Sequence, residues 1–352
     1  MKVLIAAGGT GGHVYPALAV AQALMGRGHG VEWVGNADSF EARALAKTTI
    51  PMHVVRVTAL RGKGLTGLLS APLNVVRAVA AAWRLMRRLR PDVVLGMGGF
   101  VAGPAGLAAW LARVPLVIHE QNAAAGLTNR LLARLSRKVL LGFDGALAGG
   151  HWVGNPVRSA VVELPSPSTR FAGRTGSLRV LVIGGSQGAK ALNQKVPEAL
   201  ALIDRAQRPL LRHQGGRTLA VAEAAYRQAN VEAELTAFID DMAEAFAWAD
   251  VVIARAGAST IAELAACGLG GLLVPFPHAV DDHQTANAQA LVRAGAVTCM
   301  AESDLTAQAL ADWLAGMTRE RALQCAQAAA RVARPDATRD IVAVLEACGG
   351  VA

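Results

Sequence analysis

The stretch Lys2-Val-Leu-Ile-Ala-Ala-Gly8-Gly9-Thr10-Gly11-Gly12-His13 decides the fold of the first half of the chain. Lys2 to Ala7 has the length and apolar character of a buried parallel strand, and the alanine-rich run from Val14 to Met25 is typical of a helix. The glycine-rich turn between them therefore lies at a helix N-terminus, where free backbone N–H groups and the helix dipole favour negative charge. His13 follows the glycines and can exchange a proton near neutral pH.

A second strand, glycine turn and helix begin near the middle of the chain. Leu178 to Ile183 is strand-like, Gly184 to Gly188 is a tight polar turn, and Ala189 to Leu202 is helix-like. Two such starts about half a chain apart predict two Rossmann-like domains. Between them, residues 164–177 lack periodicity and are rich in proline, serine and glycine, which is typical of a linker.

Apolar runs of strand length alternate with helical stretches along the whole chain. This alternation predicts an α/β fold, with parallel sheets covered by helices on both faces. Ligands of such sheets bind at the carboxyl ends of the strands, and with two domains the cleft between them is the expected site. The expected strands are residues 2–7, 31–35, 53–57, 92–96, 115–119, 139–142, 178–183, 209–213, 235–239, 250–254, 271–275 and 296–300.

Bulk properties exclude several classes of protein. The 352 residues are 53% hydrophobic, which is enough for two cores and excludes a disordered chain. No apolar run reaches the roughly 18 residues of a membrane span, and the run before the first glycines is too short for a secretory signal. The 4 cysteines show no CxxC spacing, so neither a zinc site nor a disulfide framework is indicated. We expect a cytosolic protein.

Positive charge is concentrated in the first half of the chain. Residues 1–157 contain 17 lysines and arginines against 6 acidic residues, and residues 158–352 contain 18 against 20. Much of the excess lies between Arg61 and Arg90, and a basic, partly apolar surface there would suit anionic lipid headgroups. An ordinary amphipathic helix with a solvated arginine face is the alternative. The spacing predicts Arg77, Arg84 and Arg88 on one helix face, and Val76, Val79, Trp83 and Met86 on another.

Nucleic acid is not an expected partner of this basic region. Aromatic residues make up only 4% of the chain, and no nucleic-acid-binding motif occurs.

Polar residues follow several of the expected strands. Turn chemistry explains any one of these groups alone, because Asn, Gly and Pro mark turns whatever the function. Their common position at the carboxyl ends of the strands predicts a binding site at that edge. The groups are His119-Glu-Gln-Asn122, Gly154-Asn-Pro-Val-Arg158 and His213-Gln-Gly-Gly216.

The segment Arg255-Ala-Gly-Ala-Ser259-Thr260-Ile-Ala-Glu263 is a further glycine turn and helix start after a strand. Thr260 and Glu263 have the spacing of a capping box. A carboxylate at a helix start beside a phosphate-binding turn can also accept hydrogen bonds from ribose hydroxyls, and we favour this role. The loop that follows has no recognised metal-ligand pattern, although it holds His278, Asp281, Asp282 and His283.

Seven motifs occur in the order and spacing of one known family. They are Gly8-Gly-Thr-Gly-Gly-His13, Gly96-Met-Gly-Gly99, His119-Glu-Gln-Asn122, Gly154-Asn-Pro-Val-Arg158, Gly184-Gly-Ser-Gln-Gly188, Phe238-Ile-Asp-Asp-Met242 and the segment from Arg255 to Glu263. In these motifs the chain resembles the bacterial UDP-N-acetylglucosamine:undecaprenyl-pyrophosphoryl-N-acetylmuramyl-pentapeptide N-acetylglucosaminyltransferases. The match spans nearly the whole chain, and seven motifs in order are specific where one would be weak.

The resemblance implies a GT-B fold, in which the parallel sheets of two Rossmann-like domains face each other across a cleft. It implies an acceptor and membrane-facing domain at residues 1–157 and a UDP-sugar-binding domain at residues 158–335, with a C-terminal helix at about 339–352 packed back on the first domain. The implied activity moves N-acetylglucosamine from UDP-N-acetylglucosamine to undecaprenyl-linked lipid I. The product is lipid II for peptidoglycan synthesis, and the enzyme would bind peripherally at the cytoplasmic face of the cell membrane.

The resemblance also implies which residues contact the donor. Glu263 would hold the ribose, the backbone of Ile239 would meet uracil, and Gln284 would contact the sugar. His283 departs from the family, which usually has a glutamine at that position, before Gln284. The implied contacts are Thr10, Gly11, Gly12, Asn122, Arg158, Ser186, Ile239, Ala258, Ser259, Thr260, Ile261, Ala262, Glu263 and Gln284.

Such a transfer needs a base for the acceptor hydroxyl and stabilisation of the departing diphosphate. The family inverts the anomeric configuration in one displacement, so one base suffices. His13 is the first candidate, as the base or the group that positions it, and Glu120 is the second; capping or phosphate binding is the alternative role of His13. No Asp-x-Asp metal motif occurs, so we expect no cofactor and no metal, with Arg158, the amides near Ser186 and helix dipoles stabilising the diphosphate.

Three other functions remain open at the level of sequence. A nicotinamide-dependent oxidoreductase would need the third glycine of GxGxxG, which the opening loop lacks. A sugar-nucleotide epimerase on the same fold would act without a lipid acceptor. A UDP-sugar sensor at the membrane would bind the donor and release no UDP.

Overall fold

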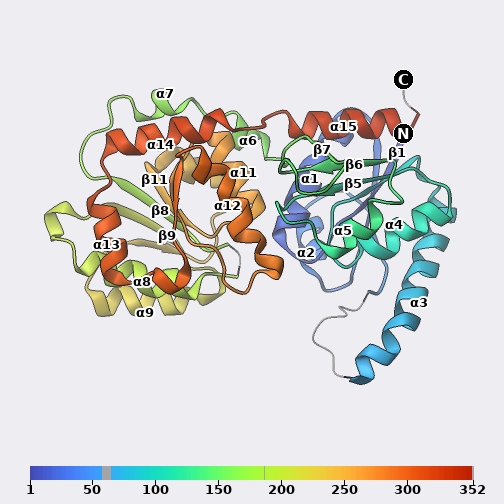
Figure 1. The fold of residues 1–352 in the computed structure, drawn as a ribbon, viewed down its shortest axis with the longest axis horizontal. Coiled ribbons are helices and arrows are strands. Elements are labelled where there is room, and N and C mark those ends of the chain that lie inside the picture. Colours follow the sequence, from blue (N-terminus) through green and yellow to red (C-terminus); the bar gives the residue numbers. More distant parts are fainter. Residues whose placement is uncertain (58–64, 186, 351–352) are drawn as a thin grey trace. The chain divides into compact units, whose positions relative to one another are not determined.

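The computed structural model describes residues 1–57, 65–185 and 187–350, which form two compact units (Figure 1). Unit 1 comprises Met1–Pro156 and Pro335–Ala352, and unit 2 comprises Val157–Arg334. The chain therefore leaves unit 1 once and returns to it near its C-terminus.

Unit 1 contains a seven-stranded sheet in the order β3-β2-β1-β4-β5-β6-β7, and all of its strand pairs are parallel. The strand order reverses direction between β1 and β4, and ligands of open α/β sheets bind beyond the carboxyl ends of the strands at such a switch point. The strands are β1 (Lys2–Ala6), β2 (Gly30–Gly35), β3 (Met52–Val54), β4 (Val93–Gly96), β5 (Leu116–Glu120), β6 (Lys138–Leu141) and β7 (His151–Trp152).

Alternate residues of β1 face two separate cores. Val3 and Ile5 pack with the helices on one side of the sheet, whereas Leu4 and Ala6 pack with those on the other. This is the pattern of a parallel strand that is buried on both faces. The helices of unit 1 are α1 (Gly11–Gly26), α2 (Phe40–Leu45), α3 (Leu65–Leu89), α4 (Ala102–Leu111), α5 (Leu127–Leu132) and α15 (Ala337–Cys348).

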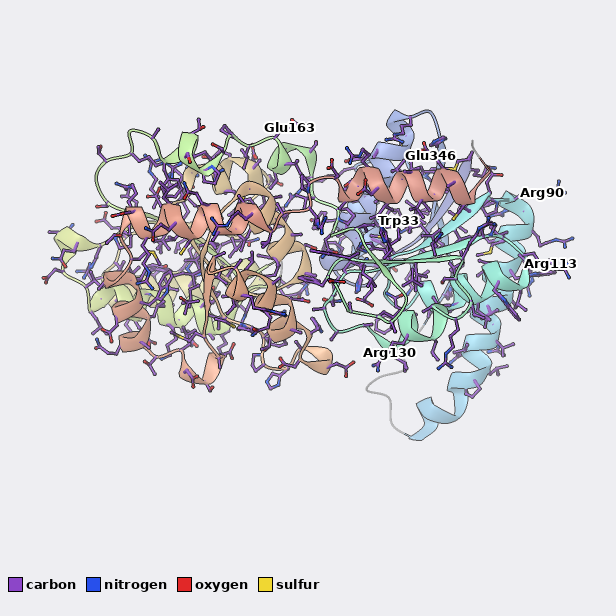
Figure 2. All side chains as sticks on the ribbon, turned by 45° about the horizontal axis from the view of Figure 1, so that its top comes forward. Trp33, Arg90, Arg113, Arg130, Glu163 and Glu346 are labelled. Carbon is purple, nitrogen blue, oxygen red and sulfur yellow. The ribbon has the colours of Figure 1, made fainter. Side chains whose placement is uncertain are left out.

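The C-terminal helix α15 packs on α1 and belongs to the core of unit 1. At its surface, Glu346 accepts a hydrogen bond from His29 Nε2 at 2.9 Å, and this bond holds the pKa of Glu346 below its ordinary value. Figure 2 shows Glu346 on this helix and Trp33, whose side chain is fully buried, inside the same unit. The side chains of α15 that are fully buried are Ile341, Val342 and Leu345.

Unit 2 contains a six-stranded parallel sheet in the order β10-β9-β8-β11-β12-β13. Its order reverses between β8 and β11, so both units have the same kind of switch point beside their first strand. The strands are β8 (Arg179–Ile183), β9 (Leu210–Gln214), β10 (Glu234–Thr236), β11 (Val251–Ala254), β12 (Gly271–Leu273) and β13 (Val297–Cys299).

Two short helices precede the first strand of unit 2, and the later helices alternate with its strands or follow them and cover both faces of the sheet (Figure 1). They are α6 (Ser159–Val162), α7 (Pro167–Phe171), α8 (Lys190–Ala201), α9 (Leu219–Ala229), α10 (Met242–Trp248), α11 (Ala258–Cys267), α12 (His283–Arg293), α13 (Ala307–Ala315) and α14 (Arg319–Arg331). Short 3₁₀ turns lie at Arg205–Gln207, Gly216–Thr218, Val280–Asp282 and Glu302–Asp304.

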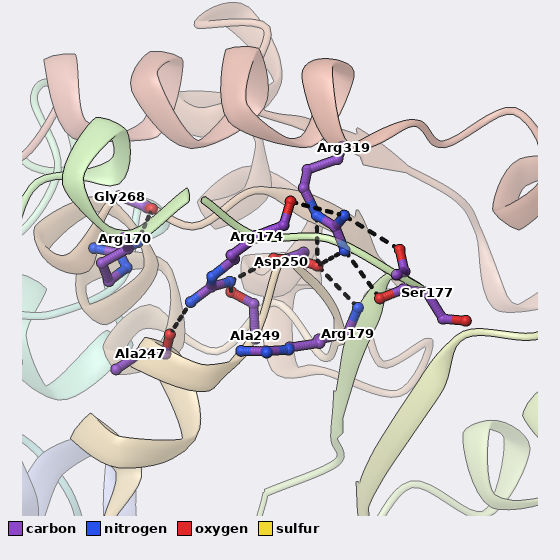
Figure 3. A network of polar contacts seen from close by, with 10 residues as sticks. Arg170, Arg174, Ser177, Arg179, Ala247, Ala249, Asp250, Gly268 and Arg319 are labelled. Carbon is purple, nitrogen blue, oxygen red and sulfur yellow. Dashed lines mark hydrogen bonds and ion pairs between the residues drawn. The ribbon is translucent and has the colours of Figure 1, made fainter. Parts of the chain in front are cut away.

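Residues 164–177, whose composition predicted a linker, are folded into unit 2. Arg174 at the end of this segment pairs with the buried carboxylate of Asp250. The same carboxylate accepts hydrogen bonds from the Arg179 N–H at 3.0 Å and from Arg319 Nη2 at 3.2 Å (Figure 3). The linker prediction was wrong because arginine side chains tie the segment to the sheet, and composition does not show such contacts.

Each of the 12 expected strands overlaps a strand of the structure, and among the strands in the described residues only β7 was not in the predicted set. Its two residues pair with β6 at the edge of the sheet. A strand this short has no alternating pattern to detect.

Candidate functional site

The first glycine-rich loop lies at the carboxyl end of β1. Thr10 is the N-cap of α1, and Gly11, Gly12 and His13 form the first helical turn. The helix thus begins three residues before the expected Val14, which places His13 in the helix. Thr10 Oγ1 lies 3.4 Å from His13 Nδ1. The N–H groups of His13 and Val14 donate to the Thr10 carbonyl oxygen at 3.1 and 3.2 Å. The N–H groups of Gly11 and Gly12 precede them at the helix N-terminus, a position that favours an anion or a sugar oxygen.

A second turn of unit 1, the one after β4, packs directly against this loop. Gly98 and Gly99 have φ values of +88° and +80°, which glycine adopts without strain. A Cβ atom at Gly98 would lie 2.8 Å from His13 Cδ2, and one at Gly99 would lie 2.1 Å from the Gly8 carbonyl oxygen. The motif Gly96–Gly99 therefore needs its glycines to let the turn approach the loop and the His13 ring.

Glu120, the second candidate base, is buried at the end of β5, and both carboxylate oxygens accept hydrogen bonds. Oε1 accepts from the Asn122 N–H at 2.9 Å and from Asn122 Nδ2 at 3.3 Å. Oε2 accepts from the Gly126 N–H at 3.1 Å and from Asn129 Nδ2 at 2.8 Å. These four donors use the accepting capacity of both carboxylate oxygens. This arrangement suits a group that holds the loop after β5.

His119 is fully buried beside Glu120, whereas His13 is only half-buried. Its Nε2 lies 2.9 Å from the Gly154 carbonyl oxygen, so Nε2 carries the proton and donates it. Burial lowers the pKa of His119 to about 4, so the ring is neutral at neutral pH. His119 therefore joins two motifs that lie far apart in the sequence.

Asn129 and Asn193 are buried residues that the sequence did not predict for the site. Asn129 holds the loop after β5, and Asn193 holds the turn after β9. Asn129 Nδ2 lies 2.8 Å from Glu120 Oε2, and Asn193 Nδ2 lies 3.0 Å from the Gly215 carbonyl oxygen. A polar side chain within an otherwise apolar helical pattern is the signal that could have found them.

The second glycine-rich loop, after β8, rests on the turn after β9. The Gly188 N–H donates to the Gly185 carbonyl oxygen at 2.9 Å, and a Cβ atom at Gly216 would lie 2.3 Å from the Gly188 nitrogen. Only glycine lets these two turns come so close. Ser186, which the resemblance placed among the donor contacts, lies outside the described residues.

A buried polar chain supports the turn after β9. Because Asn193 Nδ2 donates to backbone carbonyls, its Oδ1 accepts from His213 Nε2 at 2.9 Å. The Tyr226 hydroxyl therefore donates to His213 Nδ1 at 3.0 Å. Burial lowers the pKa of His213 to about 4, in agreement with a neutral ring that both donates and accepts.

Two residues expected to contact the donor, Arg158 and Glu263, lie together in unit 2. Arg158 Nη2 is 2.6 Å and Nε is 3.1 Å from Glu263 Oε1. Burial raises the pKa of Glu263 and the Arg158 guanidinium opposes that rise. The pair presents a cation and a carboxylate side by side, which are the groups that a phosphate and a ribose hydroxyl would meet.

The capping-box interpretation of Thr260 and Glu263 was wrong. The helix begins at Ala258 with Gly257 as its N-cap, so Glu263 lies within the helix and its side chain pairs with Arg158. The hydroxyl oxygen of Ser259 is buried and has no hydrogen-bond partner among the residues that the structure describes.

Gln284 connects the two loops that follow β11 and β12. Its Oε1 accepts hydrogen bonds from the Ala256 N–H at 3.2 Å and the Phe276 N–H at 2.9 Å. Its amide nitrogen is therefore the atom available to a sugar oxygen. Ile239, half-buried, lies in the loop between β10 and α10 at the same end of the sheet.

The described side chains include no group of three or more His, Cys, Asp or Glu residues that could hold a metal ion. Asp281 and Asp282 form a turn in which both have positive φ values, +53° and +48°.

Helix α3 presents basic and apolar side chains together on one exposed face. The prediction that the arginines and the apolar residues lie on different faces of this helix was therefore wrong in part. Val79 and Met86 are buried against α4 and the sheet, as a helix stripe requires. Val76 and Trp83, however, are 63% and 37% exposed. They share the solvent side with the exposed arginines Arg77, Arg84, Arg87 and Arg88. Residues 58–64, part of the predicted basic region, lie outside the described residues.

Further basic and apolar side chains extend this surface of unit 1. Trp110 and Leu111, at the end of α4, are 52% and 51% exposed, and sequence analysis did not single them out. Arg90 and Arg113 follow α3 and α4 and lie on the same edge of the unit (Figure 2). None of the helices within residues 1–57, 65–185 and 187–350 has the length and apolarity needed to span a bilayer.

Comparison with protein families identifies the chain. The N-terminal domain of glycosyltransferase family 28 matches residues 3–141, and the C-terminal domain of that family matches residues 179–341. The chain belongs to glycosyltransferase family 28. The two matches fall on the two sheets, each of which carries its own glycine-rich loop.

Relatives that match the chain over its full length carry a more specific name than the family. The chain is 52% identical to the "UDP-N-acetylglucosamine--N-acetylmuramyl-(pentapeptide) pyrophosphoryl-undecaprenol N-acetylglucosamine transferase" of Marinobacter nauticus, over 99% of this chain and 98% of that protein. It is 53% identical to the enzyme of the same name from Alkalilimnicola ehrlichii, over 98% of each. The crystal structure of Acinetobacter baumannii MurG superposes with a TM-score of 0.85 at 37% identity, covering 98% of this chain and 99% of that one.

These comparisons confirm the resemblance that the seven motifs indicated, the GT-B fold class and the assignment to glycosyltransferases.

Proposed function

We propose that this family 28 enzyme transfers N-acetylglucosamine from UDP-N-acetylglucosamine to lipid I, forming lipid II for peptidoglycan synthesis. The observation that carries the proposal is similarity over the full length of both chains, at 52% and 53% identity, to relatives named for this transfer. Both units are covered, so the similarity extends to the acceptor half as well as to the nucleotide half.

Unit 2 is proposed to hold most of the donor. Arg158 would bind the diphosphate, together with the amides around Ser186, while Glu263 would accept hydrogen bonds from the ribose. The backbone of Ile239 would meet uracil, and the amide nitrogen of Gln284 would donate to the sugar. The distance of 2.6 Å between Arg158 Nη2 and Glu263 Oε1 supports this assignment. It brings the group proposed for the diphosphate next to the group proposed for the ribose.

Other donor contacts come from the start of α11 and from unit 1. Ser259 offers a buried hydroxyl without a partner within the described chain, and the helix N-terminus favours a phosphate. Residues Ala258, Thr260, Ile261 and Ala262 complete this turn, and Thr10, Gly11, Gly12 and Asn122 are the proposed contacts from unit 1.

His13 is the proposed catalytic base. In a single displacement the acceptor hydroxyl oxygen attacks the anomeric carbon, its proton passes to the imidazole, and the bond to the UDP oxygen breaks with its electrons on the diphosphate. His13 is half-buried in the first turn of α1, whereas Glu120 is buried and accepts four hydrogen bonds. We therefore assign Glu120 to positioning the loop that carries Asn122.

The acceptor is membrane-linked, and unit 1 is proposed to bind the cytoplasmic face of the cell membrane peripherally. The exposed face of α3 combines arginines with Val76 and Trp83, as a surface for anionic headgroups and the acyl boundary requires. Residues 1–157 also carry a net positive charge, which favours binding of this unit to an anionic membrane.

A UDP-release assay with and without a lipid I analogue tests the proposed function. We expect UDP release that depends on the lipid. An epimerase would convert UDP-N-acetylglucosamine without any lipid, and a sensor would bind it and release no UDP; either result would refute the proposal. The full-length relatives disfavour both alternatives.

A further inference from the structure

Glu41, which sequence analysis did not single out, is a buried carboxylate directly behind the first glycine-rich loop. The residue lies in the first turn of α2 and is 1% exposed. Its Oε2 accepts a hydrogen bond from the Gly9 N–H at 3.1 Å, and its Oε1 accepts one from the Asn36 N–H at 3.0 Å. Two backbone amides thus compensate for the burial of this side chain, which would be costly without them.

The space around this carboxylate requires glycine at two positions. A Cβ atom at Gly8 would lie 2.8 Å from Glu41 Oε1, and one at Gly35 would lie 2.8 Å from Glu41 Cγ. Gly9 itself has a φ of +95°, which favours glycine. The loop sequence is therefore fitted to a carboxylate that reaches it from another helix.

The turn at Gly98 and Gly99 confines the same loop, because a Cβ atom at Gly99 would lie 2.1 Å from the Gly8 oxygen. Gly8 is thus in close contact with both Glu41 and this turn. The Gly9 peptide directs the chain into Thr10 and α1, and His13 lies in the first turn of that helix. A rotation of the Gly9 peptide would therefore move the start of the helix and the imidazole with it.

We propose that Glu41 is a positioning residue for His13, acting through the Gly9 N–H without touching substrate. The inference rests on the proposed function, in which His13 accepts the proton of the acceptor hydroxyl. A displacement of about 1 Å at a reacting group can lower a rate on the order of 100-fold. The effect of Glu41 is thus expected in kcat more than in the binding of UDP-N-acetylglucosamine.

The variant Glu41→Gln tests the proposal because the glutamine side chain has nearly the same shape as glutamate. It replaces one of the two accepting oxygens with an NH₂ group, which can only donate. Its NH₂ group would face the N–H of Gly9 or Asn36, so one of the two hydrogen bonds must be lost. We expect kcat for lipid-dependent UDP release to fall about 100-fold, with less than about a fivefold change in KM for UDP-N-acetylglucosamine. Glu32→Gln is the matched control, because Glu32 lies on β2 and pairs with His53 at 2.8 Å. Its kcat should stay at the wild-type value.

Hydrogen–deuterium exchange of the peptide that contains Gly9 gives a second readout, which needs no substrate. We expect exchange at least about tenfold faster in full-length Glu41→Gln than in the wild type, and no change in Glu32→Gln. If Glu41→Gln does not fold, Glu41→Asp keeps the charge and is too short to reach both amides, and the same two measurements apply.

Folded Glu41→Gln with kcat within about threefold of the wild type would overturn the proposal. So would unchanged exchange at Gly9, or a loss of activity that only follows the fraction of unfolded protein. If the wild type releases no UDP with the lipid present, the proposed function fails instead, and the exchange measurement still decides whether Glu41 holds the loop.

Discussion

The two units begin with the same strand, glycine loop and helix, but different groups support the two loops. In unit 1 the loop contacts the carboxylate of Glu41 and leads to His13. In unit 2 the loop rests on a turn held by neutral groups, His213 and Asn193, and a half-buried cation–carboxylate pair, Arg158 and Glu263, lies in the same unit. The same strand, loop and helix are thus supported by a carboxylate in unit 1 and by neutral polar groups in unit 2.

The largest expected effect concerns His13, the proposed base in unit 1. His13→Ala should lower kcat of lipid-dependent UDP release about 1,000-fold, within the range typical of a removed general base. Initial-rate kinetics at saturating donor and lipid measure it. Glu120→Gln is the comparison: it should lose activity together with loop order, as seen by exchange in the peptide around Asn122. If His13→Ala kept nearly full turnover while Glu120→Gln abolished it, the assignment of the base would be wrong.

The difference in charge between the units predicts which of them meets the membrane. Changing Arg77, Arg84 and Arg88 to Gln should weaken binding to anionic vesicles about 100-fold, because each basic side chain near the surface contributes about 1 kcal/mol. Vesicle sedimentation at two salt concentrations measures the change. Changing exposed arginines of unit 2, such as Arg205 and Arg217, is the control. Salt-sensitive binding that survives the triple change would contradict the role of α3.

The ion pair in unit 2 is expected to affect donor binding. Glu263→Gln removes the charge beside Arg158 and weakens the ribose contact, so KM for UDP-N-acetylglucosamine should rise about tenfold, with a smaller change in kcat. Steady-state kinetics over a range of donor concentrations measure both constants. Glu234→Gln, at an exposed ion pair with Arg212, should leave KM unchanged. Equal effects of the two substitutions would contradict the assignment of Glu263.

The neutral histidine behind the second loop predicts a pH dependence of stability. Burial lowers the pKa of His213 from 6.5 to about 4. The stability that the neutral ring contributes to the folded chain is therefore fully present above pH 6.5 and is lost as the pH falls toward 4. Between pH 7.5 and pH 5 the free energy of unfolding should drop by about 2 kcal/mol more in the wild type than in His213→Gln. Urea denaturation of the full chain at the two pH values measures this. Equal drops in both proteins would show that His213 does not stay neutral.

The fold could be predicted from sequence because buried parallel strands are nearly continuous apolar runs. Each run between glycine or polar turns corresponds to a strand, and the two glycine loops mark the two units. The segment at residues 164–177 was mistaken for a linker because the contacts of Arg174 and Asp250 are made between residues far apart in the chain.

The candidate site could be predicted only where residues stand in motifs. His13, Glu120, Arg158 and Glu263 all belong to motifs that the sequence shows, whereas Glu41 lies in a short helix with no such motif around it. The partner of a buried polar group is decided by tertiary packing, so spacing in the sequence does not reveal it.

Calorimetric titration of UDP into His13→Ala and Arg158→Ala tests most directly whether the first loop supplies the base while unit 2 binds the diphosphate. We expect His13→Ala to bind UDP within about threefold of the wild type, and Arg158→Ala to bind it at least about tenfold more weakly. A loss of UDP affinity in His13→Ala as large as that in Arg158→Ala would contradict this expectation, because the diphosphate would then depend on the first loop as much as on unit 2.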